Sequence, residues 1–170
     1  IIDAIAGLPL TSRVADCDDT KALAAALSDD SHEINIGAAG TAMRFLTAYY
    51  AARPGCDVIL DGDDRMRQRP IGRLVDALRR LGADISYAGT EGFPPLRIKG
   101  TTLSGGEIDV DASVSSQYVS AIMMVAPLMS APLHVNLPGD VVSRPYITMT
   151  AKMMAARGID VDINPTLITI

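Results

Sequence analysis

The sequence predicts an α/β fold built from a repeated unit of strands and helices. Apolar residues alternate in short segments such as 33–36, which is typical of strands, and recur at helical spacing in longer segments such as 71–81. Aromatic residues make up only 4% of the chain while Ala and Met are plentiful, which favours closely packed helices over an aromatic-rich β-sandwich. The third observation is an internal repeat of about 75 residues.

The repeat is defined by an Arg-Pro step, a helix-ending glycine and a hydroxyl residue at a helix opening. These landmarks recur after 75, 76 and 74 residues: Arg69-Pro70 and Arg144-Pro145, Gly82 and Gly158, Thr41 and Ser115. The unit reads strand, helix, strand, helix, strand, strand. We therefore interpret residues 1–170 as one domain that holds the tail of one copy (1–33), a second copy (34–107) and a third copy (108–170).

The tail and the second copy contain the first expected elements. Residues 1–15, with Pro9 and Thr11-Ser12, are expected to form a strand and a turn, and Asp18-Asp19-Thr20 to cap a helix over 21–27. The second copy is expected to contain strand 33–36, helix 42–52, strand 57–60, a helix beginning at Pro70 and ending at Gly82, and strands 84–87 and 96–99.

The third copy is expected to follow the same plan. It should contain strand 108–110, helix 118–128, strand 132–135, a helix that opens at Arg144-Pro145 and ends at Gly158, and strand 159–163.

The stretch Gly40-Thr41-Ala42-Met43-Arg44 opens one of these helices and is a candidate anion site. A helix opening leaves its first backbone N–H groups unpaired, with the positive end of the helix dipole behind them. Gly40 lets a ligand approach the backbone, Thr41 adds a hydroxyl and Arg44 adds a positive charge. Ordinary N-capping by the Gly-Thr pair is the alternative interpretation.

The helix openings of successive copies are predicted to converge at one end of the domain. Arg44, Arg65 and Arg144 would then form a positively charged bowl there. Neutral hydrogen-bonding groups suited to a hydroxylated, phosphorylated small molecule would come from Ser115, Ser116, Gln117 and Ser143. In the alternative interpretation, the serines only cap a helix and Tyr146 belongs to the core.

Composition and motifs exclude several function classes. A net charge of −5 argues against nucleic-acid binding, and no apolar run reaches membrane length. Cys17 and Cys56 lack metal or redox spacing, so we expect reduced thiols in a cytoplasmic protein. No metal or cofactor motif occurs, and His32 and His134 have no paired nucleophile, so no catalytic residue is assigned. Because the first residue is Ile, we expect the chain to be part of a longer protein.

Four motifs occur in an order and spacing that resemble a known family: Gly40-Thr41-Ala42-Met43-Arg44; Gly62-Asp63-Asp64-Arg65-Met66 with Arg69-Pro70-Ile71; Ser113-Val114-Ser115-Ser116-Gln117; and Ser143-Arg144-Pro145-Tyr146. From about Asp18 to its end, the chain resembles 5-enolpyruvylshikimate-3-phosphate (EPSP) synthase. The resemblance implies an inside-out α/β barrel of repeated βαβαββ units, with helices inside and sheets outside, of the enolpyruvyl transferase type. It covers most of the family's N-terminal domain.

The resemblance also implies roles for individual residues. Shikimate 3-phosphate would be bound by Ser115, Ser116, Gln117, Ser143 and Tyr146. Phosphoenolpyruvate would be bound by Gly40, Arg65 and Gln117, with Thr41 and Arg44 in supporting roles. Ala38 and Phe45 stand where the family usually has Asn and Pro. Both differences are expected to reshape the Gly40 loop, so the family's glyphosate sensitivity is not carried over to this chain. Arg144 replaces the more usual Lys.

The implied reaction moves the enolpyruvyl group of phosphoenolpyruvate to the 5-hydroxyl of shikimate 3-phosphate and releases phosphate, in the shikimate pathway of aromatic amino acid biosynthesis. The family's acid and base groups lie outside this chain, so the 170 residues alone are predicted to be inactive. The implied partner is the C-terminal domain of the same protein, which we expect to be monomeric at full length and to need no cofactor.

Two other functions are considered. UDP-N-acetylglucosamine enolpyruvyl transferase is similar in fold but usually carries a reactive cysteine on a loop over its site, and Cys56, between Pro54-Gly55 and a strand, is poorly placed for that role. A non-catalytic anion-binding domain of the same fold would have no need for Arg65, Gln117 and Tyr146 together.

Overall fold

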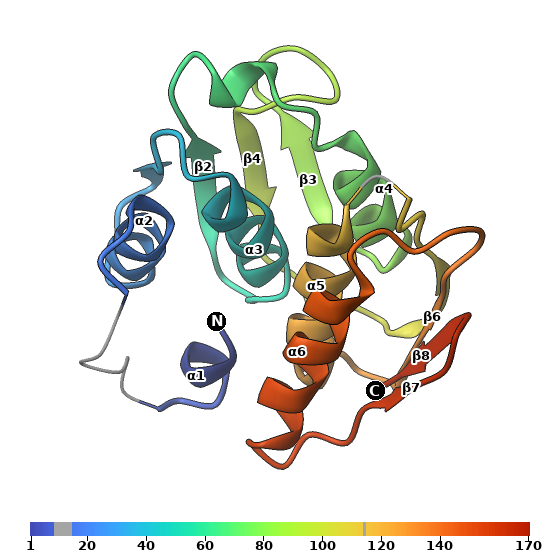
Figure 1. Cartoon of the computed structure of the whole chain (residues 1–170). Helices are drawn as coiled ribbons and strands as arrows, with labels where there is room; N and C mark the ends of the chain where they lie inside the picture. Colours follow the sequence, from blue (N-terminus) through green and yellow to red (C-terminus); the bar gives the residue numbers. More distant parts are fainter. Residues whose placement is uncertain (9–14, 114) are drawn as a thin grey trace.

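Two four-stranded sheets with the same strand order form the outer parts of the computed structural model, which describes residues 1–8, 15–113 and 115–170 (Figure 1). The first sheet has the order β1-β2-β4-β3, with strands Glu33–Asn35, Asp57–Asp61, Leu96–Lys99 and Asp84–Tyr87. The second has the order β5-β6-β8-β7, with strands Gly106–Asp109, Leu133–Asn136, Leu167–Thr169 and Asp162–Ile163. In each sheet the first two strands are parallel and the remaining pairs are antiparallel.

Each sheet is connected by two helices in the same pattern. In the first unit, α3 (Gly40–Ala51) joins the parallel strands β1 and β2, and α4 (Gly72–Arg80) precedes the antiparallel pair. In the second unit, α5 (Ser116–Val125) and α6 (Arg144–Ala155) take these positions. The 3₁₀ turns η1 (Met66–Gln68) and η2 (Ala126–Leu128) lie in the connections. Both units therefore have the predicted order βαβαββ.

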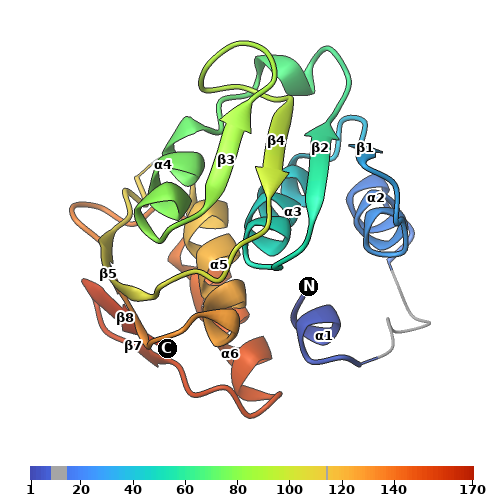
Figure 2. The same cartoon turned by 180° about the vertical axis from the view of Figure 1, so that it is seen from behind.

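Two helices lie inside the molecule. Ten of the twelve residues of α3 and nine of the ten residues of α5 are buried. Strand β4, by contrast, alternates between buried and exposed residues, as a sheet with one solvated face does. Helices α3 and α5 are central in both views, and the first sheet is behind α3 in Figure 1 and in front of it in Figure 2. The predicted α/β class, with helices inside and sheets outside, is confirmed.

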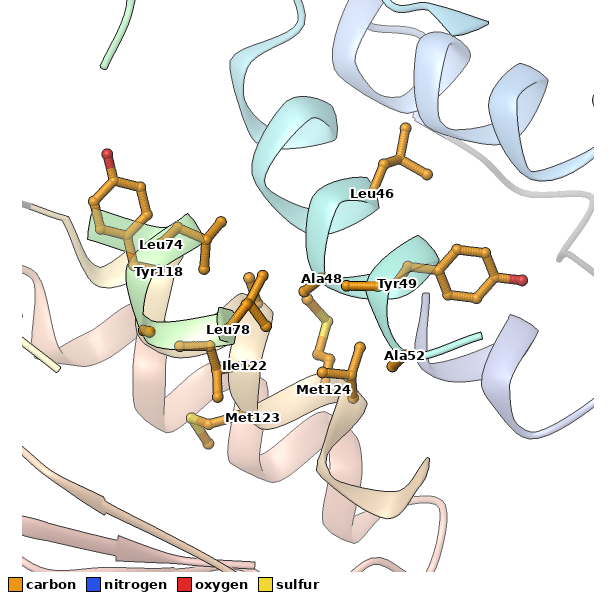
Figure 3. Close-up of a cluster of buried hydrophobic side chains, with 14 of the residues drawn as sticks. Leu46, Ala48, Tyr49, Ala52, Leu74, Leu78, Tyr118, Ile122, Met123 and Met124 are labelled. Atoms are coloured by element: carbon orange, nitrogen blue, oxygen red, sulfur yellow. The ribbon is translucent and has the colours of Figure 1, made fainter. Parts of the chain in front are cut away.

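The core is an aliphatic and Met-rich cluster in which side chains from three helices meet (Figure 3). Leu74 and Leu78 of α4 and Ile122 and Met123 of α5 are fully buried, and Ala48 lies in the middle of α3. Alanine on α3 lets the neighbouring helix approach closely, and flexible Met side chains fill the remaining space. No helix in residues 1–8, 15–113 and 115–170 is long and apolar enough to cross a membrane.

The N-terminal segment differs from its prediction. A strand was expected within 1–15, but Ile2–Ile5 form the short helix α1, in which Ile2 is buried. A short apolar run fits either a strand or a buried helix, and here packing against α5 decides for the helix. Asp3 of α1 pairs with Arg157, at 2.7 Å between Asp3 Oδ1 and Arg157 Nη2. Pro9, Thr11 and Ser12, on which the predicted turn rests, lie outside the described residues, as does Val114.

Several helix ends also differ from expectation. Helix α2 spans Asp18–Leu27, so Asp18 and Asp19 are its first residues and not its cap, which is Cys17. Helix α4 begins at Gly72 and not at Pro70, because the N–H groups of Ile71 and Gly72 donate to the Gly92 carbonyl and hold this segment outside the helix. Strand β8 was not assigned from its own residues, although the repeat unit requires it.

Truncation of Ile122 to Ala is expected to lower the free energy of unfolding by about 2–5 kcal/mol, because the side chain is fully buried and its removal leaves a cavity in a closely packed cluster. Met153→Ala is the control, since Met153 is 48% exposed and should change stability by about 0.5 kcal/mol or less. Urea unfolding followed by circular dichroism measures both. Equal effects of the two substitutions would contradict the description of α5 as the central helix.

Candidate functional site

A cavity of about 610 Å³ lies where the first turns of three helices meet. Each helix contributes hydroxyl or amide side chains to it. Among the lining residues are Thr41 of α3, Ser115, Ser116 and Gln117 at the start of α5, and Ser143 and Tyr146 at the start of α6. All five residues expected to bind shikimate 3-phosphate therefore line one cavity, although α5 and α6 begin far apart in the sequence.

The start of α5 offers an anion the positive end of a helix dipole. Ser115 is the N-cap, and its Oγ accepts a hydrogen bond from the Gln117 N–H at 3.2 Å. Ser116 is the first residue of the helix and is 7% exposed. Capping uses the hydroxyl of Ser115 as an acceptor, so that its hydrogen can still be donated to a ligand.

The start of α6 is held in a strained conformation. Ser143, its N-cap, has φ 58° and ψ 39°, which is the left-handed region that side chains other than Gly rarely adopt. Such strain costs about 1–3 kcal/mol and is typical of functional sites. Tyr146, in the first turn of α6, is 60% exposed, so the alternative that places it in the core is wrong.

One hydrogen bond joins the two repeated units at this cavity. Gln117 Nε2 of α5 donates to Thr41 Oγ1 of α3 at 3.2 Å, across 76 residues of sequence. Neither side chain is free to rotate without breaking this bond. The Gln117 amide is therefore held at the border between the α3 opening and the α5 opening.

The opening of α3 is capped from another helix. Asp19 Oδ1 of α2 accepts from the Thr41 N–H at 2.9 Å and from the Ala42 N–H at 3.4 Å. The alternative interpretation, in which the Gly40-Thr41 pair is an ordinary N-cap, is wrong, since the N-cap is Ala39 and makes no side-chain cap bond. The Asp19 carboxylate therefore occupies two amides of the first turn of α3, which leaves fewer of them for an anionic ligand than the sequence suggests.

Arg44 lies beneath this loop and does not face the cavity. It is 6% exposed, and its guanidinium donates to the Gly40 carbonyl at 2.9 Å and to the Pro70 carbonyl at 3.5 Å. Burial, together with the nearby Arg69 guanidinium, holds the pKa of Arg44 below its ordinary value. Arg44 thus fixes the backbone of the Gly40 loop and supplies positive potential from behind it.

The predicted positive bowl of three arginines is wrong. Arg65 is exposed just before η1 and does not line the cavity. Arg144 donates to the Asn164 carbonyl at 3.3 Å and to the Pro165 carbonyl, which directs it to the turn between β7 and β8. Arg69 lies at the α3 opening, because a Cβ on Gly40 would be 2.1 Å from Arg69 Nη1.

Other charged groups near the Arg65 segment pair with each other. Arg67 binds Asp61 through two hydrogen bonds of 3.0 and 2.5 Å, and these bonds hold the pKa of Asp61 below its ordinary value. The described ranges contain no group of three or more His, Cys, Asp or Glu residues arranged to hold a metal ion.

The cavity is also lined by five residues that were not assigned to it from the sequence: Phe45, Ser120, Val142, Met149 and Thr150. Helical spacing could have identified several of them, since Phe45, Ser120 and Thr150 each follow an assigned residue by four positions. A larger open groove of about 790 Å³ runs along the outer side of α6, lined partly by Met149 and Met153, and contains none of the expected substrate ligands.

Replacement of Asp19 by Ala is expected to lower the free energy of unfolding by about 1 kcal/mol more than replacement of Asp18 by Ala. Both carboxylates lie in the first turn of α2, but Asp19 also caps α3. The difference between the variants therefore isolates the contact between the two helices. Equal stability of the two variants in urea unfolding would show that the cap of α3 contributes nothing.

Comparison with known proteins places the chain in a family. Residues 12–170 match the family model for EPSP synthase (3-phosphoshikimate 1-carboxyvinyltransferase). The chain is 51% identical over 148 residues to a 3-phosphoshikimate 1-carboxyvinyltransferase of Bacteroides fragilis, covering 87% of the chain and 36% of that protein. It is 52% identical over 129 residues to the protein of the same name in Pectobacterium atrosepticum, covering 76% of the chain and 30% of that protein.

Solved structures agree with this result. An EPSP synthase structure from Acinetobacter baumannii matches with a TM-score of 0.71 and 28% sequence identity, over 82% of the chain and 30% of that protein. The chain thus spans about a third of the length of the curated relatives it matches. The family match covers nearly all of its residues and agrees with the fold. The chain belongs to the EPSP synthase (3-phosphoshikimate 1-carboxyvinyltransferase) family.

Proposed function

We propose that this chain is the substrate-binding part of an enzyme that transfers the enolpyruvyl group of phosphoenolpyruvate to the 5-hydroxyl of shikimate 3-phosphate, with release of phosphate. The observation that carries the proposal is the single cavity lined by all five residues expected to bind shikimate 3-phosphate. Its relatives bear the name of this activity. The corresponding pathway is the synthesis of aromatic amino acids, in the cytoplasm.

Shikimate 3-phosphate would bind with its phosphate at the start of α5. Ser115 and Ser116 supply hydroxyl donors there, the helix dipole favours negative charge, and Ser143 adds a third hydroxyl from α6. Tyr146 is exposed at the cavity wall, where its ring can pack against the ring of the substrate. Neutral donors at a helix terminus bind a phosphate without burying an additional charged side chain.

Phosphoenolpyruvate would bind beside it, at the opening of α3. The Gly40 N–H and the Gln117 amide would contact this second anion, with Thr41 and the buried Arg44 in support. Arg65 is exposed, and we assign it to the same anion on the family resemblance. Two anions held side by side need oriented donors and positive potential, and such preorganised groups stabilise charge most effectively when water is excluded.

In the proposed reaction, the substrate hydroxyl loses its proton and adds to C2 of phosphoenolpyruvate as C3 is protonated. The tetrahedral intermediate then loses phosphate from C2 and a proton from C3, which restores the enolpyruvyl double bond. This chain orients the two substrates, and the acid and base groups belong to the remainder of the longer protein, which closes over the cavity. We therefore propose that the 170 residues alone are inactive.

Two further proposals concern the organisation of the protein. The full-length enzyme is a monomer that needs no cofactor. Residues 1–33, 34–107 and 108–170 belong to three successive repeats.

Calorimetric titration of the chain with shikimate 3-phosphate tests the proposal, with UDP-N-acetylglucosamine as the comparator ligand. We expect selective binding of shikimate 3-phosphate, weakened about tenfold or more in Ser116→Ala and Gln117→Ala, because each variant removes a hydrogen bond to a charged ligand. Ser86→Ala is the control, since Ser86 is exposed on β3. Absence of shikimate 3-phosphate binding, or binding of the sugar nucleotide alone, would contradict the proposal.

Substitution of Arg65 in the full-length protein separates a transferase from a non-catalytic anion-binding domain. Arg65→Ala is expected to raise KM for phosphoenolpyruvate at least tenfold, because a charged hydrogen-bond donor to the anion is lost. Arg67→Ala is the control, because Arg67 is already paired with Asp61. Steady-state kinetics with each substrate varied in turn gives both values, and a protein without turnover, or one indifferent to Arg65, would refute the transferase.

A further inference from the structure

Two buried hydroxyl groups connect α5 and α6 at the wall of the cavity. Ser120 is 3% exposed and Thr150 is 6% exposed. Thr150 Oγ1 lies 2.9 Å from Ser120 Oγ, so the two side chains are hydrogen-bonded to each other from different helices. Both line the same cavity as the expected substrate ligands. The Ser120–Thr150 pair is therefore a polar contact between two helices whose other buried residues are mostly apolar.

The pair lies one helical turn below two expected ligands of shikimate 3-phosphate. Ser120 follows Ser116 by four residues on α5, and Thr150 follows Tyr146 by four residues on α6. Residues four apart share one face of a helix, one above the other. A bond between the lower residues therefore sets the spacing and rotation of the upper ones.

The pair belongs to a series of two consecutive hydrogen bonds. Thr150 Oγ1 is also 3.0 Å from the Tyr146 carbonyl, which can only accept. Since Thr150 has one hydroxyl hydrogen, both bonds form together when Thr150 donates to Tyr146 and Ser120 supplies the hydrogen for the other bond. These two hydrogen bonds link α5 directly to the backbone of the first turn of α6. Hydrogen bonds from Ser or Thr to the carbonyl four residues earlier often bend a helix.

Apolar side chains would serve the packing of this interface equally well. The other buried residues that α6 contributes are Ile147, Ala151 and Met154, and burial of two hydroxyls is favourable only when they are bonded. Apolar contact is non-directional, whereas a hydrogen bond constrains both distance and angle. The hydroxyl pair therefore serves mainly to fix the distance and angle between α5 and α6, and contributes less to stability.

We propose that Ser120 and Thr150 are positioning residues, whose hydrogen bond holds α5 and α6 so that Ser116 and Tyr146 meet the same molecule of shikimate 3-phosphate. The inference deepens the proposed function and rests on it for the identity of the ligand. The effect of the pair is on the affinity for shikimate 3-phosphate, through the alignment of the two helix openings.

Calorimetric titration of the chain with shikimate 3-phosphate tests the pair by a double-mutant cycle. Thr150→Val and Ser120→Ala are each expected to weaken binding by roughly three- to tenfold, which is the range for loss of one hydrogen bond. The double variant should bind no more weakly than Thr150→Val alone, because Thr150→Val has already removed the bond that Ser120→Ala removes. Thr150→Ser retains the hydroxyl and should bind within about twofold of the unsubstituted chain.

A second buried threonine provides the matched control. Thr47 is fully buried on α3, and its hydroxyl donates to the Met43 carbonyl of its own helix at 2.7 Å. Thr47→Val removes a buried hydroxyl of the same kind away from the cavity, so it reports the effect on stability alone. We expect it to leave affinity unchanged.

Backbone amide NMR shifts provide a readout that needs no ligand. Thr150→Val, on α6, should shift the amide of Ser116 on α5, and Ser120→Ala should shift that of Tyr146 on α6, whereas Thr47→Val should shift neither. Unchanged affinity in Thr150→Val, additive effects in the cycle, or absence of these shifts across the interface would overturn the inference. If the unsubstituted chain does not bind shikimate 3-phosphate, the proposed function fails, and the amide shifts still decide whether the pair aligns the helices.

Discussion

The burial of α5 on nearly all sides is the constraint on which the rest of the structure depends. Nine of its ten residues are buried, so most of its side chains must be apolar. Its first turn is the place where the hydroxyl side chains of Ser115 and Ser116 and the amide of Gln117 reach a cavity. The same packing brings α3 and α6 beside α5 and directs their first turns to the same cavity. A core requirement thus creates the cavity that is the candidate binding site.

Hydrogen bonds between helices give this surface its geometry. The cap of α3 by Asp19, the bond between Gln117 and Thr41, and the Ser120–Thr150 pair each join two helices. Arg44 ties the Gly40 loop to the Pro70 carbonyl in the same way. Apolar packing brings the helices together, while these directional contacts fix their rotation and spacing. The site therefore depends on a small number of polar contacts within a largely aliphatic core.

Much of the fold could be predicted from local signals, and two of the errors share one cause. The alternation of apolar residues, the helix-ending Gly82 and Gly158, and the Arg-Pro steps located most strands and helices. These two errors arose where a distant partner overrode the local signal. Residues Ile2–Ile5 became a helix by packing on α5, and Gly92 delayed the start of α4 to Gly72. Strand β8 is short and was evident only through the repeat.

The sequence by itself determined the repeated unit, the family and the group of residues at the α5 and α6 openings, because these are properties of spacing and residue type. Only the tertiary structure decided how charge is distributed around them. Asp19 reaches α3 across 22 residues, Arg44 is turned beneath the loop, and Arg144 is drawn to the carbonyls of Asn164 and Pro165. Long side chains have several possible partners, and which one they bind depends on backbone groups that the fold brings near. Local sequence patterns carry no information about those groups.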